Sequence, residues 1–357
     1  MAKNLSFVVL CIVLTFGGIR RDGKLTANLS SAVKGIASLL IVLTHCISKS
    51  GIENGIVGSL STGWLTVALF FFLSGYGSAY GLCRKEGYMD HFLRNRFVRV
   101  CVPLVLAYLV YAGYRLLMYG QFILDTPQKI ILGTATVPYS WYPIVALCFY
   151  AFIRISFRLS DRNGMRLIML SMLVVGMTFL MSMFIGSGQD YWYISNFSFV
   201  FGAALSMFDP QLRFRKYVLT AAAVCAAGGF LLLPVCNRLL GEYSETVYML
   251  SCNFGSGFLV TAVVLLLTMT GKSNKTTLFL GKISYEIYLY HGLFIQIMAD
   301  VFHLRSWWAL FLCTTASTIA FSVLMHIPDS FLCGKLCKRT ETETNPKPEP
   351  VDSPKSV

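Results

Sequence analysis

The chain has 357 residues, of which 55% are hydrophobic and only 13% are charged, and its mean hydropathy is +0.63. This composition excludes a water-soluble globular protein and is typical of a polytopic membrane protein. A net charge of +13 would favour nucleic-acid binding in a soluble chain, but here the cations lie between apolar runs, so we expect contact with the lipid bilayer and none with nucleic acid.

The first apolar segment, residues 5–19, falls below the roughly 20 residues of a complete membrane span. A cleaved signal peptide has this length, but Arg20, Arg21 and Lys24 follow directly, and such a basic cluster stays in the cytoplasm. We therefore favour a short retained anchor helix, with residues 1–27 forming the anchor and its basic linker.

Ten further apolar runs predict an all-α fold, a polytopic membrane helix bundle with a ten-span core plus the short extra helix. We assign residues 28–333 to this membrane domain. Residues 334–357 are rich in Pro, Glu, Lys and Thr and predict a disordered tail. The ten predicted spans are residues 29–47, 64–82, 98–118, 137–157, 167–185, 191–208, 217–235, 247–270, 278–301 and 307–327.

The lysines and arginines are divided unequally between alternate connections of these spans. One side holds all but six of the 30, in the linker, in every second connection and in the tail. By the positive-inside rule this side is the cytoplasm, so we predict a multi-pass protein of the cell (inner or plasma) membrane with a cytoplasmic C-terminus. The six cations of the other side are Lys3, Lys49, Arg115, Lys129, Arg238 and Arg305.

The first core span carries a cation at its cytoplasmic foot, Lys34, and an imidazole toward its outer end, His45. In a helix these two residues lie about 20° apart on one face and about 16 Å apart along the axis. An ionisable side chain inside the membrane is costly and indicates a functional site. In the alternative interpretation, Lys34 only reaches the headgroups and His45 only marks the helix end.

Two stretches near the cytoplasmic boundary suit an anionic ligand. Arg96 and Arg99, one turn apart, form a phosphate clamp together with the lysine of the first span, although boundary arginines also act simply as topology determinants. Ser74, Gly75 and Tyr76 lie in a run of small residues, which indicates either close helix packing or close approach of the backbone to a ligand.

Aromatic and polar side chains gather in the fourth and ninth spans. Trp141 and Tyr142 open the fourth span on the outer side, as an interfacial belt or as a stacking surface for an acceptor. In the ninth span Glu286, Tyr288 and His291 predict a buried polar network, which serves packing or supports a site. The remaining histidines, interpreted as incidental, are His91, His303 and His326.

Together these stretches resemble the membrane-bound acyltransferase-3 family, whose bacterial members O-acylate glycans and other cell-envelope molecules. The resemblance covers most of residues 29–327. The family usually has Phe where this chain has Tyr76, and the N-terminal segment is additional. The shared motifs are Lys/Arg-x10-His (Lys34, His45), Ser-Gly-Phe-like (Ser74, Gly75, Tyr76), Arg-x-x-Arg (Arg96, Arg99), a Trp-aromatic pair (Trp141, Tyr142) and Ser-Tyr…Tyr-Leu-x-His (Ser284, Tyr285, Tyr288, Leu289, His291).

The resemblance implies an O-acyltransferase that moves an acyl group, with acetyl as the preferred choice, from cytoplasmic acyl-CoA to a hydroxyl of a cell-envelope glycan or lipid-linked sugar. Acetyl-CoA would be a co-substrate rather than a permanently bound cofactor. Its phosphates would lie at the basic residues of the inner boundary, and the Ser-Gly-Tyr stretch would line the path of its pantetheine arm. His45 would act as general base or as a transient acyl carrier.

Two other functions use the same residues without acyl transfer. A transporter or flippase of a lipid-linked glycan would use the charged site for passage, although we find no internal repeat. A sensing or scaffold subunit would bind the acyl-CoA without turnover. The 11 cysteines show no metal-ligand spacing, and we expect no metal site.

Overall fold

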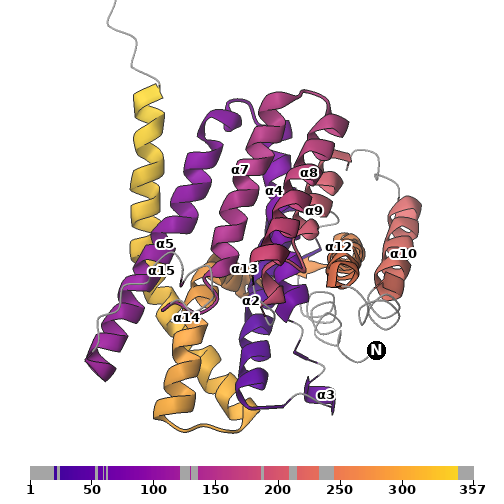
Figure 1. Ribbon diagram of the computed structural model, residues 1–357. Coiled ribbons are helices and arrows are strands. Elements are labelled where there is room, and N and C mark those ends of the chain that lie inside the picture. Colours follow the sequence, from indigo (N-terminus) through magenta and orange to yellow (C-terminus); the bar gives the residue numbers. More distant parts are fainter. Residues whose placement is uncertain are drawn as a thin grey trace, which may run out of the picture.

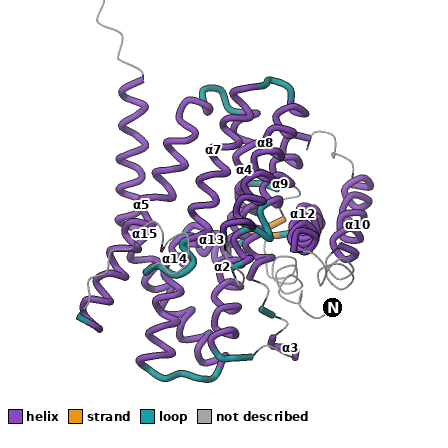
Figure 2. Tube along the Cα trace, viewed as in Figure 1, coloured by secondary structure: helices purple, strands orange, loops and turns teal. Residues whose placement is uncertain are grey.

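The computed structural model describes residues 20–21, 25–52, 55–58, 60–61, 63–120, 129, 136–185, 189–208, 215–232 and 245–344. These residues form a bundle of helices with one two-stranded ribbon (Figure 1, Figure 2). The elements are β1 (Arg20–Arg21), α2 (Ala27–Lys49), α3 (Gly55–Gly58), α4 (Gly63–Arg84), α5 (Tyr88–Tyr119), α7 (Trp141–Leu159), α8 (Asn163–Phe184), the 3-10 turn η2 (Asp190–Trp192), α9 (Phe197–Phe208), α10 (Arg215–Leu231), α12 (Glu245–Thr270), β2 (Lys272–Ser273), α13 (Lys275–Lys282), α14 (Ser284–Gln296), the π-helical turn η5 (Ile297–Val301) and α15 (Trp307–Thr344).

Seven helices of the described residues are long and apolar enough to cross a membrane, namely α2, α4, α5, α7, α8, α12 and α15. The prediction of an all-α polytopic membrane bundle is therefore confirmed. The other three predicted spans contain shorter or broken helices, which are α9, α10 and the series α13, α14 and η5. The predicted anchor at residues 5–19 lies outside the described residues.

The sixth predicted span, residues 191–208, is an α-helix only from Phe197 onward. A side chain of α12 explains this late start. The Asn253 amide donates to the Tyr193 carbonyl oxygen at 2.6 Å, and its own oxygen accepts from the Phe197 N–H at 3.1 Å. The chain before α9 is thus held in an irregular path whose polar groups are satisfied from another helix.

The ninth predicted span, residues 278–301, is interrupted at Ile283, between α13 and α14. The interruption lies where α13 presses on α2. A Cβ atom at Gly281 would collide with the backbone oxygen of Ser31, and a Cβ at Gly35 would collide with the Gly281 backbone. This close packing brings the foot of α2 next to the start of α14.

Several of the segments that the charges assign to one side of the membrane lie at one end of the bundle (Figure 1). The turns from α4 to α5 and from α7 to α8 lie at the upper end of the bundle in Figure 1, and the C-terminal part of α15 projects from the same end. β1 pairs antiparallel with β2, which joins the basic linker to the α12–α13 connection. All of these segments belong to the side with the excess of lysine and arginine.

The C-terminal helix is longer than expected. α15 continues through Pro328 to Thr344, whereas the sequence predicted disorder from residue 334. The Arg94 guanidinium donates to the Leu336 backbone oxygen at 3.2 Å, so α5 holds this part of α15 in place. Residues 334–344 of the predicted tail are therefore helical, the division into domains stays a prediction, and residues 345–357 lie outside the described residues.

Candidate active site

Both residues of the predicted Lys-x10-His motif lie on one continuous helix, α2. Lys34 and His45 therefore keep the separation of about 16 Å and the shared face that a regular helix requires. The helix begins with a cap, because the Thr26 hydroxyl oxygen accepts a hydrogen bond from a backbone N–H of the first turn at 3.2 Å. One rigid element thus fixes the relative positions of the cation and the imidazole.

Three aromatic rings meet at the outer end of α2, and we call them the three-ring cluster. His45 comes from α2, Tyr139 from the loop before α7, and His291 from α14. The ring centroids are 3.9 Å apart for His45 and Tyr139, 5.1 Å for Tyr139 and His291, and 5.2 Å for the two histidines, with interplanar angles of 27°, 14° and 25°. His45 therefore faces other protein rings. The sequence alone does not distinguish Tyr139 from the neighbouring aromatic residues at the start of the fourth span.

His291 is fully buried, and its hydrogen bonding defines which ring nitrogen is free. Nδ1 lies 2.6 Å from the backbone oxygen of Tyr288. Because a carbonyl oxygen only accepts, Nδ1 of the neutral ring carries the hydrogen and Nε2 keeps a lone pair. Nε2 has no hydrogen-bond partner in the part of the chain that the structure describes. The cluster thus contains a proton-accepting atom that the fold does not use.

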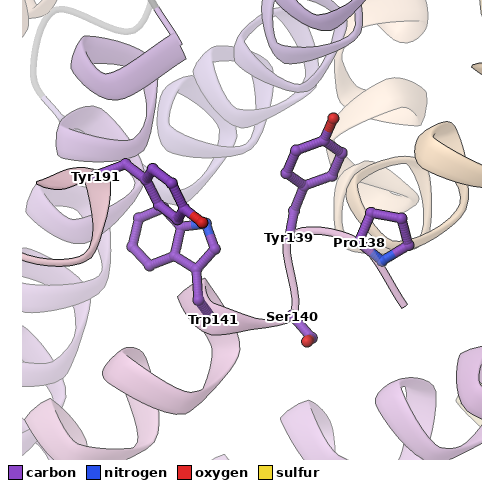
Figure 3. Close-up of a pocket in the computed structure, with 5 residues that line it drawn as sticks. All are labelled: Pro138, Tyr139, Ser140, Trp141 and Tyr191. Atoms are coloured by element: carbon purple, nitrogen blue, oxygen red, sulfur yellow. The ribbon is translucent and has the colours of Figure 1, made fainter. Parts of the chain in front are cut away.

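A cavity of about 130 Å³ lies beside the three-ring cluster at the start of α7. The Trp141 and Tyr191 rings form one of its walls, with centroids 5.4 Å apart, and the Tyr139 ring stands on the other side of the loop (Figure 3). The lining residues are Pro138, Tyr139, Ser140, Trp141 and Tyr191.

Arg96 turns into the bundle at the other end of the site. Its guanidinium carbon lies 5.6 Å from the ring centroid of Phe92 and 5.2 Å from that of Tyr150, and one of its amino groups donates to the Tyr88 hydroxyl at 3.4 Å. Its Nε is buried without a partner among the described residues. This arginine therefore has donors available for a ligand.

Lys34 and Arg96 are near enough to repel each other electrostatically, so the predicted basic cluster is present for these two residues. Arg99 differs, because it is exposed and its charge acts on Cys333 of α15. The ion pairs of the described residues include none of these three cations. Two adjacent cations without a carboxylate partner are a favourable place for phosphate.

Tyrosines occupy the space between the two ends. The Tyr288 hydroxyl donates to the Tyr139 backbone oxygen at 2.6 Å, and the Tyr288 ring meets the Tyr142 ring edge-on at 5.2 Å. Tyr285, one turn earlier on α14, donates to the Val100 oxygen at 3.0 Å. We call the following residues, each of which interacts with another of them, the tyrosine row: Tyr288, Tyr142, Tyr285 and Tyr150.

The predicted Ser-Gly-Tyr stretch of α4 contributes unequally. Ser74 is buried and lies near the Tyr142 hydroxyl of the tyrosine row. Gly75 faces α9, where a Cβ would collide with the Phe199 backbone oxygen, so helix packing is sufficient to explain this glycine, and its role in ligand binding stays a prediction. Tyr76 is buried and stacks on another tyrosine of α4.

Glu286 belongs to a different polar cluster from the one we predicted. Its carboxylate oxygen lies 2.5 Å from Nδ1 of His326 in α15, and the charge of Glu286 acts on Tyr290. The sequence interpretation joined Glu286 with Tyr288 and His291 and regarded His326 as incidental. Both statements are corrected, because Glu286 lies on a different face of α14 from the other two residues.

The site as a whole suits a long ligand with an anionic end and a reactive end. Unpaired cations lie at one end of α2, and two imidazoles beside an aromatic cavity lie at the other. The tyrosine row joins the two ends with hydroxyl groups and ring faces. Such an arrangement can bind phosphate at a distance from the atom on which the chemistry takes place.

A family model described as an acyltransferase domain matches residues 31–327, which include the three-ring cluster, the tyrosine row and the inner cations. No curated protein and no solved structure shows a significant match. The family match covers most of the chain and confirms the resemblance seen in the motifs. The chain belongs to the membrane-bound acyltransferase-3 family.

Proposed function

We propose that this membrane acyltransferase moves an acetyl group from cytoplasmic acetyl-CoA to a hydroxyl of a cell-envelope glycan, such as a surface polysaccharide or a lipid-linked sugar. The observation that carries the proposal is the geometry of α2. This helix holds Lys34 in the inner basic cluster and His45 in the three-ring cluster beside the outer cavity. The protein then lies in the cell membrane, with its C-terminus in the cytoplasm.

The donor would bind with its phosphates at the basic end. Arg96 has an unpartnered buried Nε, and Lys34 lies within reach of its charge, so an added phosphate relieves the repulsion between the two cations. Arg99 contributes from the exposed side of α5. The pantetheine arm would follow the tyrosine row, past Ser74, toward His45.

The acyl transfer itself needs one base. The acceptor oxygen forms a bond to the carbonyl carbon, the bond from that carbon to the CoA sulfur breaks, and the hydroxyl proton ends on the sulfur as CoA leaves as the thiol. His45 serves this step either as general base, by taking and returning the proton, or as acyl carrier, by attacking the thioester first. The free Nε2 of His291 offers a second acceptor for a hydrogen bond from the substrate hydroxyl.

The acceptor would bind from the outer side. Trp141 and Tyr191 give the cavity flat apolar faces that match the CH faces of a sugar ring, and Tyr142 lies just inside them. The volume of about 130 Å³ accommodates one sugar unit rather than a whole chain. These features support a glycan hydroxyl as acceptor.

Acetyl transfer can be measured with the purified protein in lipid nanodiscs. The protein is incubated with acetyl-labelled acetyl-CoA and an envelope extract, and the glycan fraction is tested for alkali-labile label. We expect labelled glycan with the unmodified protein and none with His45→Ala.

Two results would contradict the proposal. Passage of lipid-linked glycan across a vesicle membrane without label transfer would identify a flippase. Binding of acetyl-CoA with no turnover in the presence of the whole extract would identify a sensing subunit.

A further inference from the structure

The backbone of Tyr139 has an unusual conformation. Its φ is 66°, and His303 is the only other non-glycine residue with positive φ in the part of the chain that the structure describes. For a bulky residue this left-handed conformation costs about 1–2 kcal/mol, whereas glycine or asparagine adopts it with less strain. A tyrosine at such a position indicates that its side chain has a role which the turn alone does not require.

The Tyr139 ring covers one face of the His45 imidazole. Their centroids are 3.9 Å apart, closer than the 5.2 Å between His45 and His291. An imidazole that is packed flat against a ring cannot rotate about its side-chain bonds without breaking the contact, which is worth about 0.5–1.5 kcal/mol for an aromatic pair. Tyr139 therefore restricts the directions in which the two nitrogens of His45 point.

The loop that carries the Tyr139 ring is held by α14. The Tyr139 backbone oxygen accepts the hydrogen bond from the Tyr288 hydroxyl, and the preceding residue, Pro138, lies against Gly292. A Cβ at Gly292 would stand 3.2 Å from Pro138 Cγ and 3.0 Å from the Tyr111 hydroxyl, so a side chain there would push the loop outward. The loop that carries Tyr139 is thus supported at two consecutive residues by the helix that also carries His291.

We propose that Tyr139 is a positioning residue, whose ring holds the His45 imidazole in one orientation between α14 and the outer cavity. The catalytic consequence of this inference rests on the proposed function. Because Tyr139 also lines the cavity, the same ring sets the distance between an acceptor and His45. Loss of the ring would leave His45 in the site but free to turn away from the reacting atoms.

The test uses three variants of the full-length protein in nanodiscs. Tyr139→Phe keeps the ring, Tyr139→Leu removes it, and Tyr139→Asn removes it while accepting the left-handed backbone, so it folds even where the leucine variant does not. Tyr119→Leu, at an exposed tyrosine near the end of α5, is the matched control. Two quantities are measured. The first is the kinetics of acetyl transfer, and the second is the rate at which diethyl pyrocarbonate modifies His45, which is monitored by peptide mass spectrometry.

We expect Tyr139→Leu and Tyr139→Asn to lower kcat by about 10- to 100-fold, as expected for a misoriented catalytic group, with the KM for acetyl-CoA unchanged. His45 should react faster with diethyl pyrocarbonate in both variants, because an imidazole that is no longer held by the stacked ring can turn its nitrogen lone pairs toward the space that the tyrosine leaves. Tyr119→Leu should match the unmodified protein in both measurements. Tyr139→Phe should have a kcat and a His45 modification rate much closer to those of the unmodified protein than to those of Tyr139→Leu, because the ring is kept. A role limited to folding would instead lower the amount of folded protein and leave kcat per folded molecule unchanged.

Two results would overturn the inference. In the first, Tyr139→Asn has the kinetics and the His45 reactivity of the unmodified protein. In the second, Tyr139→Phe is as impaired as Tyr139→Leu, which would assign the role to the hydroxyl and not to the ring. If the unmodified protein transfers no acetyl group, the proposed function fails, and the His45 modification rates still decide whether the ring covers the imidazole.

Discussion

The two faces of α14 hold polar groups of different kinds. One face carries Tyr285, Tyr288 and His291 toward α2 and α7, and these residues join aromatic rings, backbone oxygens and the region of the outer cavity. The other face carries Glu286 and Tyr290 toward α15. There Glu286 hydrogen-bonds to His326, and Tyr290 lies near the Asp329 carboxyl group.

This difference separates a reactive site from a packing cluster within a single helix. On the first face, His291 keeps a free acceptor nitrogen beside a second imidazole. On the second face, the Glu286 carboxylate is held by His326, next to the buried side chain of Asp329. Under the proposed function, catalysis would belong to the first face, and the second face would attach α14 to α15.

The largest expected difference is between two histidines, His45 beside the first face of α14 and His326 beside the second. His45→Ala should lower acetyl transfer by about 10³-fold or more, because it removes the base or acyl carrier, while His326→Ala should leave most of the activity. The rates are measured at equal amounts of membrane-inserted protein. Full activity of His45→Ala, or equal losses in both variants, would remove the distinction between the two faces.

The basic end provides the next largest effect. Arg96→Ala should raise the KM for acetyl-CoA by about tenfold or more, since it removes a charge-assisted contact to phosphate, with little change in the KM for the acceptor. Arg99→Ala should have a smaller effect in the same direction, because Arg99 is exposed whereas Arg96 is partly buried. The measurement is a donor titration at fixed acceptor.

Protease protection of the two arginine variants in sealed vesicles provides the control for that experiment. Both variants should show the topology of the unmodified protein. Failure to insert, or an inverted orientation, would mean that these arginines act as topology determinants and not as donor-binding residues.

The second face of α14 should affect stability more than catalysis. Glu286→Gln weakens the hydrogen bond with Nδ1 of His326 and should lower the free energy of unfolding by about 1–3 kcal/mol, while kcat per folded molecule changes little. Denaturation in detergent, together with a double-mutant cycle that includes His326→Ala, gives the coupling between the two residues. A large loss of kcat in a protein of normal stability would bring Glu286 into the reaction after all.

The smallest effect is expected at the middle of the donor path. Ser74→Ala removes a buried hydroxyl near Tyr142 and should reduce kcat/KM for acetyl-CoA by about two- to tenfold, the range for a single neutral hydrogen bond to a ligand. Gly75→Ala is its matched neighbour and should reduce the amount of folded protein, because α9 leaves no room for a Cβ. Reversed results for these two variants would show that the arm follows α9 and not the tyrosine row.

Much of the fold could be predicted because a membrane span has a local signature. The lengths of the apolar runs predicted the long helices. Two of the basic connections, α4 to α5 and α7 to α8, lie at the same end of the bundle (Figure 1). The late start of α9 could not be predicted, because it depends on Asn253, which comes from a distant helix. The interruption at Ile283 likewise depends on how closely Gly281 approaches α2, and glycine in a span is compatible with many packings.

The site was predictable only where one helix carries the pattern. Lys34 and His45 share α2, so their separation follows from helix geometry alone. The angular positions on α14 could have separated Glu286 from Tyr288, but the partner of Glu286 is on α15, and nothing in the local sequence identifies His326. Tyr139 could not be identified either, since its role depends on a backbone angle and on rings from two other elements.

The central claim is that a thioester supplied from the cytoplasm reaches His45 through the interior of the bundle. It can be tested with sealed vesicles of known orientation, with labelled acetyl-CoA on one side only and acceptor glycan on the other. The account predicts labelled glycan only when acetyl-CoA is on the side of Lys34 and Arg96, and none in vesicles with His45→Ala. Equal labelling from either side, or labelling that persists in His45→Ala, would contradict it.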